Sequence, residues 1–365
     1  MIDSGILRNE EKAIYALRSL YGKYGYKPFK MSKFEEYEFY IQNKDFLVSD
    51  RIIAFNDTSG KLLALKPDVT LSIVKNGEDT DDYKQKVCYN ENVYRVSENT
   101  HRFKEIMQTG VECIGKINLY DIYEVILMAA ESLQLISDNF VLEISHLGIL
   151  LSLLDSVCTN TAFKQEAIKY ISDKNPHDLS RICDENFVDK KLKNVLLDFV
   201  SVYGERGTVL QKLDTLSEYF DTAALNELKT LSAMLDKLSC SGKIKFDFSA
   251  VNNTNYYNGI VFRGYISGIS QSVLAGGQYD RLLHKMGRRS GAIGFAIYLD
   301  LLDDLPSKTQ EFDVDVLLLC DDATDNEALI DTVNQTVQSG KTVSVQNTDT
   351  QKIRYKEIID IRGGV

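Results

Sequence analysis

The stretch YRVSENTHRFKEIMQTGVE, residues 94–112, is the most informative part of this chain. Its first residues predict a strand that runs into Arg95, and residues 97–102 form a polar loop. From residue 103 the sequence predicts a second strand, which returns beside the first. Two strands joined by so short a loop pair in antiparallel fashion, so this stretch predicts a hairpin within a sheet.

The returning strand is expected to have two different faces. Successive side chains of a strand point to opposite faces, so Gln108, Gly110 and Glu112 would share one of them. The opposite, packing face would carry Phe103, Met107 and Val111. A polar face with a gap at Gly110 either meets solvent or lines a pocket for a small ligand, and a single hairpin by itself favours solvent.

The residues before this hairpin predict two helices and a smaller hairpin. Residues 9–24 have apolar side chains at helical spacing, and Gly25 ends that helix. Residues 51–55 and 61–66 flank the turn formers NDTSG and predict two paired strands. A short helix then begins at DVT, residues 68–70, and continues through Val74. In its first turn Asp68 or Thr70 has an ordinary structural role, capping free amide groups.

Downstream, helices and strands alternate until the character of the sequence changes. The expected elements are helices at 119–133 and 147–157 and strands at 140–144 and 243–248. Between them, residues 155–241 lack strand signals and read as an all-helical insertion with charged faces. That insertion contains no constellation of residues that indicates chemistry.

Two glycine-rich segments follow. AGGQYDRLL, residues 275–283, predicts a double glycine followed by the start of a helix, and SGAIGFAIYLDLL, residues 290–302, predicts glycine-rich backbone entering an apolar helix. Glycines that begin helices let a ligand approach closely and expose amide groups to anions. Tight packing of a strand on a helix explains such glycines at least as well.

The chain is expected to consist of a large domain, residues 1–305, and a smaller segment, residues 306–365. Beyond the linker at Leu305 and Pro306, the sequence predicts a strand at 314–320, a helix at 325–339 and a strand at 342–346. This amounts to about half of a small α/β domain, which can bury little apolar surface on its own.

Composition excludes several classes of function. The formal net charge is −11, and proteins that bind nucleic acid by its backbone usually carry a basic surface, so nucleic-acid binding is disfavoured. The six cysteines are scattered without a CxxC pair, and no two of the four histidines have the spacing of metal ligands, so neither a metal site nor a disulfide framework is expected. No membrane-spanning run or signal-peptide core is present, which predicts a cytoplasmic protein.

Taken in order, five segments resemble motifs of histidyl-tRNA synthetase, a class II aminoacyl-tRNA synthetase. They are KPDVT (66–70), the opening hairpin (94–112), NYYNGIVF (255–262), AGGQYD (275–280) and GAIGFAIYLDLL (291–302). They are similar to that family's RPEGT, motif 2, DYYTGTVF, AGGRYD and motif 3. The resemblance covers roughly residues 5–305, and five motifs in the right order form a specific signal where one would be weak.

The resemblance implies an α+β fold with an antiparallel sheet of six or seven strands flanked by helices, usually in a homodimer. It also implies a histidine pocket. In that pocket Asp68 and Thr70, with Val69 between them, would meet the α-ammonium group, and Arg95 would lie near the carboxylate or a nucleotide phosphate. The remaining expected histidine-binding residues are Gln108, Glu112, Tyr256 and Tyr257, the two tyrosines on the imidazole side.

Departures from the synthetase pattern argue against catalysis. The motif 3 arginine falls at Leu301, and a second expected arginine falls at Asn252. Losing one group that stabilises developing charge typically costs about 10² to 10³ in rate, so adenylate formation is not expected. Three further positions depart from the pattern. Ser97 stands where the family has the glutamate that reads adenine, although Glu98 is adjacent, Ser32 stands in place of the motif 1 proline, and Asp68 in place of the RPEGT glutamate. The complete anticodon-binding domain is also missing.

A chain with a histidine pocket but without the groups that activate histidine with ATP resembles the regulatory subunit of ATP phosphoribosyltransferase. That subunit is a synthetase paralogue that acts in the first step of histidine biosynthesis. That family has RPD in place of RPE, here with Lys66 at the arginine position. The resemblance implies a non-catalytic, cofactor-free subunit that activates a short catalytic subunit and transmits feedback inhibition by histidine in a hetero-oligomer. Two alternatives remain: a divergent or truncated histidyl-tRNA synthetase, and another synthetase-like paralogue that binds a different amino acid.

Overall fold

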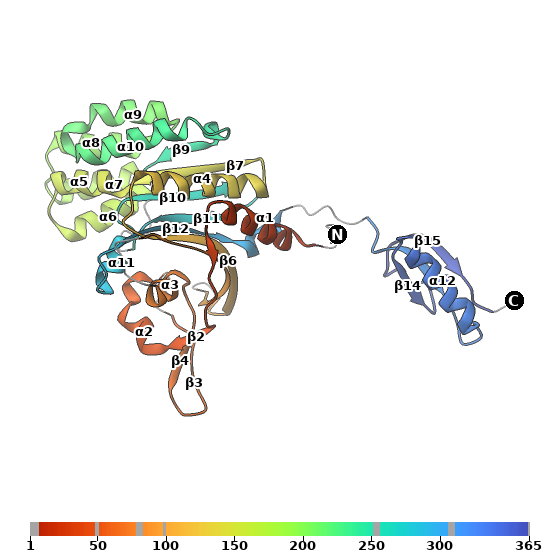
Figure 1. Cartoon of the computed structure of the whole chain (residues 1–365). Coiled ribbons are helices and arrows are strands. Elements are labelled where there is room, and N and C mark those ends of the chain that lie inside the picture. Colours follow the sequence, from red (N-terminus) through yellow and green to blue (C-terminus); the bar gives the residue numbers. More distant parts are fainter. Residues whose placement is uncertain are drawn as a thin grey trace. The chain divides into compact units, whose positions relative to one another are not determined.

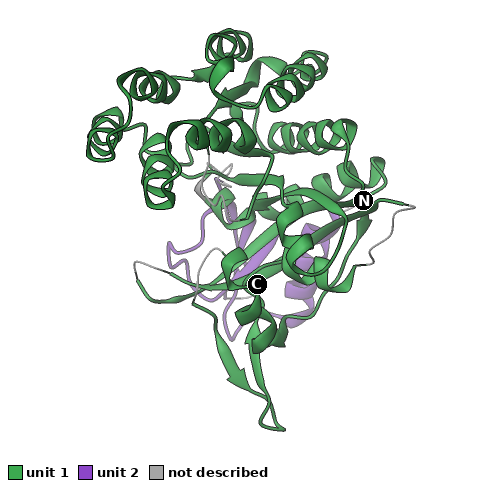
Figure 2. Cartoon of the chain, turned by 90° about the vertical axis from the view of Figure 1, so that its left-hand side faces the viewer, with its two compact units in different colours: residues 1–305 green, residues 306–365 purple. Residues whose placement is uncertain are grey.

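The computed structural model describes residues 7–47, 51–77, 83–97, 100–250, 256–305 and 311–363. The chain divides into two units, Met1–Leu305 and Pro306–Val365, coloured separately in Figure 2. Each unit is described below by itself. Among the described residues, no helix combines the length and the apolar character needed to cross a membrane.

The larger unit is built on one wide sheet. Six neighbouring strands, in the order β5-β6-β12-β11-β10-β7, are antiparallel. In that order they span Gln85–Val96, Phe103–Gly115, Gly291–Tyr298, Leu274–Gln278, Ile260–Ile266 and Phe140–His146. Three short strands widen the sheet to nine: β1 (Lys27–Pro28) lies parallel to β5, β9 (Ile244–Asp247) parallel to β7, and β8 (Tyr203–Gly204) antiparallel to β9.

The opening hairpin is confirmed as β5 and β6, and it separates two cores. On one face of the sheet Val111 and Cys88 belong to the main core, to which α1 (Asn9–Lys23) and α4 (Leu119–Ile136) contribute. On the opposite face Tyr89 belongs to a second core, with side chains from α2 (Tyr37–Gln42), α3 (Thr70–Asn76) and α11 (Asp280–Lys285). Figure 1 shows α1 and α4 on one side of the sheet and α2 and α3 on the other.

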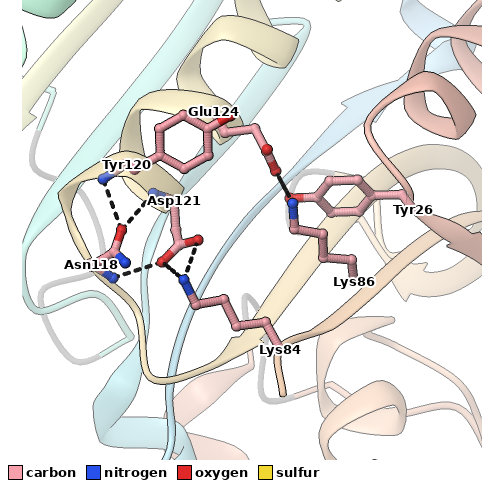
Figure 3. Close-up of polar contacts among 7 residues, drawn as sticks. All are labelled: Tyr26, Lys84, Lys86, Asn118, Tyr120, Asp121 and Glu124. Carbon is pink, nitrogen blue, oxygen red and sulfur yellow. Dashed lines mark hydrogen bonds and ion pairs between the residues drawn. The ribbon is translucent and has the colours of Figure 1, made fainter. Parts of the chain in front are cut away.

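Charged side chains attach α4 to the sheet (Figure 3). Asn118 caps the helix by accepting from the amides of Tyr120 and Asp121, and its own amide donates to Asp121. Asp121, which is buried, also accepts from Lys84 Nζ at 2.6 Å. One turn later Glu124, also buried, pairs with Lys86 at 2.5 Å and accepts from the hydroxyl of Tyr26. A buried carboxylate is tolerated when it is paired in this way.

A small second sheet leads into α3. Its strands β2 (Phe34–Glu36), β4 (Leu62–Leu65) and β3 (Ala54–Asn56) are antiparallel, which confirms the expected hairpin of β3 and β4. Asp57 closes the turn between them by accepting from the amides of Ser59 and Lys61 at 2.8 and 2.9 Å. Gly60 adopts a φ of 84°, which favours glycine.

Residues between β7 and β9 are almost entirely helical. The helices are α5 (Leu147–Val157), α6 (Thr161–Ser172), α7 (Pro176–Glu185), α8 (Lys190–Val200), α9 (Arg206–Thr215) and α10 (Thr222–Leu235), with short 3₁₀ turns at Ser217–Tyr219 and Ser241–Lys243. The two-residue strand β8 is the exception. These helices carry much of the main core, and asparagine or aspartate caps α6, α7, α8 and α10.

In the first glycine-rich segment the double glycine is followed by helix α11, as expected, whereas the apolar helix predicted in residues 290–302 is wrong. Gly276 and Gly277 lie inside β11 rather than at the start of α11, and the apolar run forms β12 followed by a 3₁₀ helix, Leu299–Asp304. A Cβ atom on Gly276 would lie 2.5 Å from the carbonyl oxygen of Gly294. Close packing therefore explains the double glycine. Short apolar runs do not distinguish a buried strand from a helix, which accounts for the error.

Within its described residues, 311–363, the smaller unit contains three parallel strands and one helix. The strands are β14 (Val343–Gln346), β13 (Val314–Leu319) and β15 (Tyr355–Asp360), with β13 in the centre, and the helix is α12 (Asn326–Gln338). The first three elements in sequence were expected, but β15 was missed. Its sequence, YKEIID, is half charged because it forms an exposed edge, and its apolar pattern is correspondingly weak.

Candidate ligand-binding site

A small cavity of about 70 Å³ lies on the face of the sheet that carries the second core. Its walls come from the start of α3, from strands β5, β6, β11 and β12, and from the segment before β10. The lining residues are Asp68, Val69, Thr70, Tyr89, Arg95, Gln108, Glu112, Tyr256, Tyr257, Ala275, Tyr279, Gly294, Phe295, Ala296 and Tyr298. All eight residues that the sequence singled out are among them. The eight come from three of the five motifs, and the full lining includes residues of all five.

Glu112 lines the cavity and is 2% exposed. Both of its carboxylate oxygens accept hydrogen bonds, from Thr70 Oγ1 at 2.7 Å and from the hydroxyl of Tyr279 at 2.5 Å. Burial, with a smaller contribution from the nearby Asp68, raises the pKa of Glu112 to about 8 against the opposing effect of the two hydrogen bonds. An acid with such a pKa in a cavity is well suited to respond to a charged ligand.

Space for this carboxylate comes from a glycine on the neighbouring strand. Gly294 of β12 pairs directly with Glu112 of β6. A Cβ atom on Gly294 would overlap with Oε2 of Glu112 and with the carbonyl oxygen of Val111. No side chain fits there without displacing the carboxylate or the strand.

Asp68 combines the two roles that the sequence suggested. Its Oδ1 accepts from the amide of Leu71 at 2.8 Å, which stabilises the first turn of α3, and the same side chain borders the cavity. Burial raises the pKa of Asp68, while the hydrogen bond from Leu71 and the charge of Arg95 oppose that shift. Arg95 is itself oriented by a hydrogen bond from its Nε to the carbonyl oxygen of Pro67 at 3.1 Å.

The polar face of β6 is not solvated. Gln108 is 3% exposed, and there is no gap at Gly110, because a Cβ atom there would lie 2.7 Å from the hydroxyl of Tyr89 on the paired strand. On the opposite face Val111 is buried in the main core and Met107 packs against it, as expected. Phe103 is 73% exposed, so its assignment to the packing face is wrong. It is the first residue of β6, beside the loop, where no core lies beneath the strand.

Aromatic rings enclose the rest of the cavity. The ring centroids of Tyr256 and Tyr257 are 4.7 Å apart, and that of Tyr279 lies 5.7 Å from Tyr256. Tyr279 was not predicted as a site residue, although it stands in the quoted motif AGGQYD. Tyr89 and Tyr298 were missed as well. The sequence predicted the strands that carry these two tyrosines. It did not show which face of each strand borders the cavity, so the tyrosines could not be chosen as site residues.

Several departures from the synthetase pattern lie away from this cavity. Leu301 is in the 3₁₀ helix after β12 and packs against the main core. Lys66 is fully buried and forms an ion pair with Glu91 at 2.8 Å, and it does not line the cavity. Asn252 lies outside the described residues. No group of three or more histidine, cysteine or acidic residues within the described ranges could hold a metal ion.

Comparison with known proteins places the chain in a family. The family model for histidyl-tRNA synthetase matches residues 6–302. An ATP phosphoribosyltransferase regulatory subunit from Alkaliphilus metalliredigens is 30% identical over 284 residues, covering 76% of this chain and 72% of the relative. Another from Oceanobacillus iheyensis is 29% identical over 362 residues, covering 95% of this chain and 87% of the relative. The chain belongs to the ATP phosphoribosyltransferase regulatory subunit family.

Solved structures confirm the fold expected for a regulatory subunit of this family. The crystal structure of an ATP phosphoribosyltransferase regulatory subunit/histidyl-tRNA synthetase from Bacillus halodurans C has a TM-score of 0.78 at 24% identity, covering 97% of this chain and 94% of that chain. A chain of the ATP phosphoribosyltransferase (HisG:HisZ) complex from Thermotoga maritima has a TM-score of 0.63 at 21% identity, covering 80% and 97%. At such identities the likeness concerns the fold alone, which is that of a class II synthetase.

Proposed function

We propose that this regulatory subunit binds L-histidine in the cavity around Glu112 and thereby transmits feedback inhibition to a short catalytic subunit of ATP phosphoribosyltransferase, which it also activates. The observation that carries the proposal is the electrostatic imbalance of the cavity wall. Two carboxyl groups, Glu112 and Asp68, and one guanidinium, Arg95, are the charged groups among its lining residues. Burial raises the pKa of both carboxyl groups, so a second negative charge is costly without a bound cation.

An amino acid supplies a balancing charge in a suitable form. Its α-ammonium group donates three hydrogen bonds, and Asp68, Thr70 and Gln108 offer oxygen acceptors in the cavity wall. Its carboxylate would meet Arg95, since a guanidinium is the preferred partner of a carboxylate. Tyr256 and Tyr257 would close on the side chain, with Val69 in contact beside them. An imidazole suits this end of the cavity because it needs polar partners in apolar surroundings, and phenol and carboxyl groups supply them.

We propose that the subunit does not catalyse a reaction by itself. Family membership supports this view, and so do Leu301 and Asn252 at positions where the synthetase pattern has arginines. A divergent histidyl-tRNA synthetase is the second candidate, because the matching family model is that of histidyl-tRNA synthetase. Without positively charged groups at both positions, charge developing on the phosphates of ATP would be left poorly stabilised.

The proposed assembly is a homodimer within a larger hetero-oligomer that contains the short catalytic subunit. The similarity to a chain of the Thermotoga maritima complex supports a partner of that kind. Light scattering on the chain alone and after mixing with a short ATP phosphoribosyltransferase tests both steps. A monomer that forms no mixed species would contradict the proposal.

The decisive experiment compares histidine binding with catalysis on one sample. Calorimetric titration with L-histidine is expected to show saturable binding, and histidine-dependent ATP–pyrophosphate exchange is expected to stay at background. Glu112→Ala should abolish binding, while Glu218→Ala, an exposed acidic residue in the helical insertion, serves as the control. Exchange above background would make the protein a synthetase. Preference for another amino acid would leave a sensor with a different ligand.

A further inference from the structure

Tyr256 and Tyr257 lie outside any helix or strand, immediately before β10. A residue outside helices and strands lacks their regular backbone hydrogen bonds, so other contacts must fix these tyrosines beside the cavity. Ring contacts to Tyr279 and to Phe46, whose centroid lies 6.3 Å from that of Tyr256, orient the rings but do not hold the backbone. The next residue along the chain, Asn258, provides the backbone attachment.

Asn258 and Asp280 bind each other reciprocally. Asn258 Nδ2 donates to Asp280 Oδ2 at 3.0 Å, and the amide of Asp280 donates to Asn258 Oδ1 at 2.7 Å. The remaining carboxylate oxygen of Asp280 accepts from the amide of Ala292 in β12 at 2.8 Å. The backbone amide of Asn258 also donates to the carbonyl oxygen of Gln278. One aspartate thus joins the tyrosine segment, the start of α11 and a strand that lines the cavity.

A second contact fixes the same segment. The side chain of Gln278 lies across Gly259, and its Oε1 accepts from the amide of Ile260 at 2.7 Å. A Cβ atom on Gly259 would overlap with that oxygen, so the close approach requires glycine. Neither Asn258, Gln278 nor Asp280 is among the residues that line the cavity.

We propose that the reciprocal pair Asn258–Asp280 is a clasp that positions Tyr256 and Tyr257 over the cavity and thereby sets the affinity for the ligand without touching it. This inference rests on the proposed histidine site. Both members are positioning residues. The two motifs that carry them, NYYNG and AGGQYD, are more than fifteen residues apart in sequence and meet through this pair.

The chemistry of the pair allows a charge-swap test. In Asp280→Asn the new NH₂ group faces either the NH₂ group of Asn258 or the backbone amide of Ala292, so one of these two donors loses its acceptor. In Asn258→Asp two carboxylates face each other. The double variant Asn258→Asp/Asp280→Asn restores all three side-chain contacts. Its new amide at position 280 can still accept from Ala292 and can donate to the new carboxylate at position 258. Each single variant is expected to weaken histidine binding roughly 10-fold, as for loss of a hydrogen bond to a charged group, and the double variant should bind like the wild type.

Two readouts separate this inference from the proposed function. Calorimetry with L-histidine measures affinity, and hydrogen exchange of the backbone amides of residues 256–260 in the ligand-free protein measures how firmly the segment is held. Faster exchange and weaker binding in both single variants, reversed in the double variant, support the clasp. Unchanged affinity in the single variants, or a double variant that stays weak, overturns it. If the wild type binds no histidine, the histidine site fails, while exchange still decides whether the pair holds the segment.

Discussion

At the scale of single residues, the site depends on a carboxyl group that is buried where it is expensive to ionise. Glu112 accepts hydrogen bonds from Thr70 and Tyr279 and faces Gly294 across the sheet. Residue type and strand position made Glu112 a candidate from the sequence. Its raised pKa and its partner Tyr279 could not be predicted, because both result from neighbours that are distant in the chain.

Histidine binding should depend on pH through Glu112. Its pKa of about 8 means that the carboxyl is mostly protonated at neutral pH in the ligand-free protein. A bound cation favours the ionised form and lowers that pKa, so binding releases protons and affinity rises as the pH increases from about 6 to about 8. Calorimetry in two buffers of different ionisation enthalpy measures this release. Glu112→Gln should remove the proton release that is due to Glu112. Undiminished proton release in this variant would show that another group titrates.

Gly294→Ala tests whether the fit of the carboxylate limits stability. The new methyl group would overlap with Glu112 Oε2 and with backbone of β6, so we expect a loss of about 2 kcal/mol in unfolding free energy and loss of histidine binding. Denaturant unfolding followed by circular dichroism provides the measurement. Gly207→Ala is the matched control, because a Cβ atom there meets nothing within 4 Å in helix α9. It should be neutral or stabilising.

At the scale of elements, pairing with strands distant in the sequence decided the secondary structure where the local sequence pattern was ambiguous. The run GAIGFAIY looks equally like a buried strand or a helix, and its insertion between β6 and β11 makes it a strand. Elements with a clear period, such as α1 and the β5–β6 hairpin, were predictable. The short charged edge strand β15 was not, because an exposed edge requires no apolar face.

The attachment of α4 should depend on its buried acidic residues. Asn118→Ala removes the cap and should cost about 1 kcal/mol of unfolding free energy. Asp121→Ala should cost more, about 2 kcal/mol, because it removes the other half of the capping box and leaves Lys84 without its partner. Asp155→Ala breaks an exposed pair with Lys164 and should change stability little. Equal effects of the two aspartate variants would refute the role given to burial.

At the scale of the whole molecule, every residue that lines the cavity belongs to the larger unit. The lining runs from Asp68 to Tyr298, and the boundary between the units follows Leu305. The lining includes no residue of the helical insertion, residues 155–241.

Deletion of residues 306–365 should leave histidine affinity within about twofold of the full chain, since the residues that line the cavity all belong to the larger unit. Calorimetry on the shortened protein, after circular dichroism has shown that it is folded, gives the comparison. A folded protein that no longer binds would assign the smaller unit a direct role in the site.

The sequence by itself predicted which segments would form the cavity and which of their side chains are expected to bind an amino acid. Strand parity, a local property, placed Gln108 and Glu112 on one face of β6. Asp68 and the Tyr256–Tyr257 pair were expected in the site because their motifs resemble those of histidyl-tRNA synthetase. Tertiary structure alone decided that Gly294 would make room for Glu112, that Tyr279 would bond it, and that Asn258 would bind Asp280. Those relations depend on register between strands far apart in the chain. Register is set by the packing of the whole sheet rather than by any short stretch of residues.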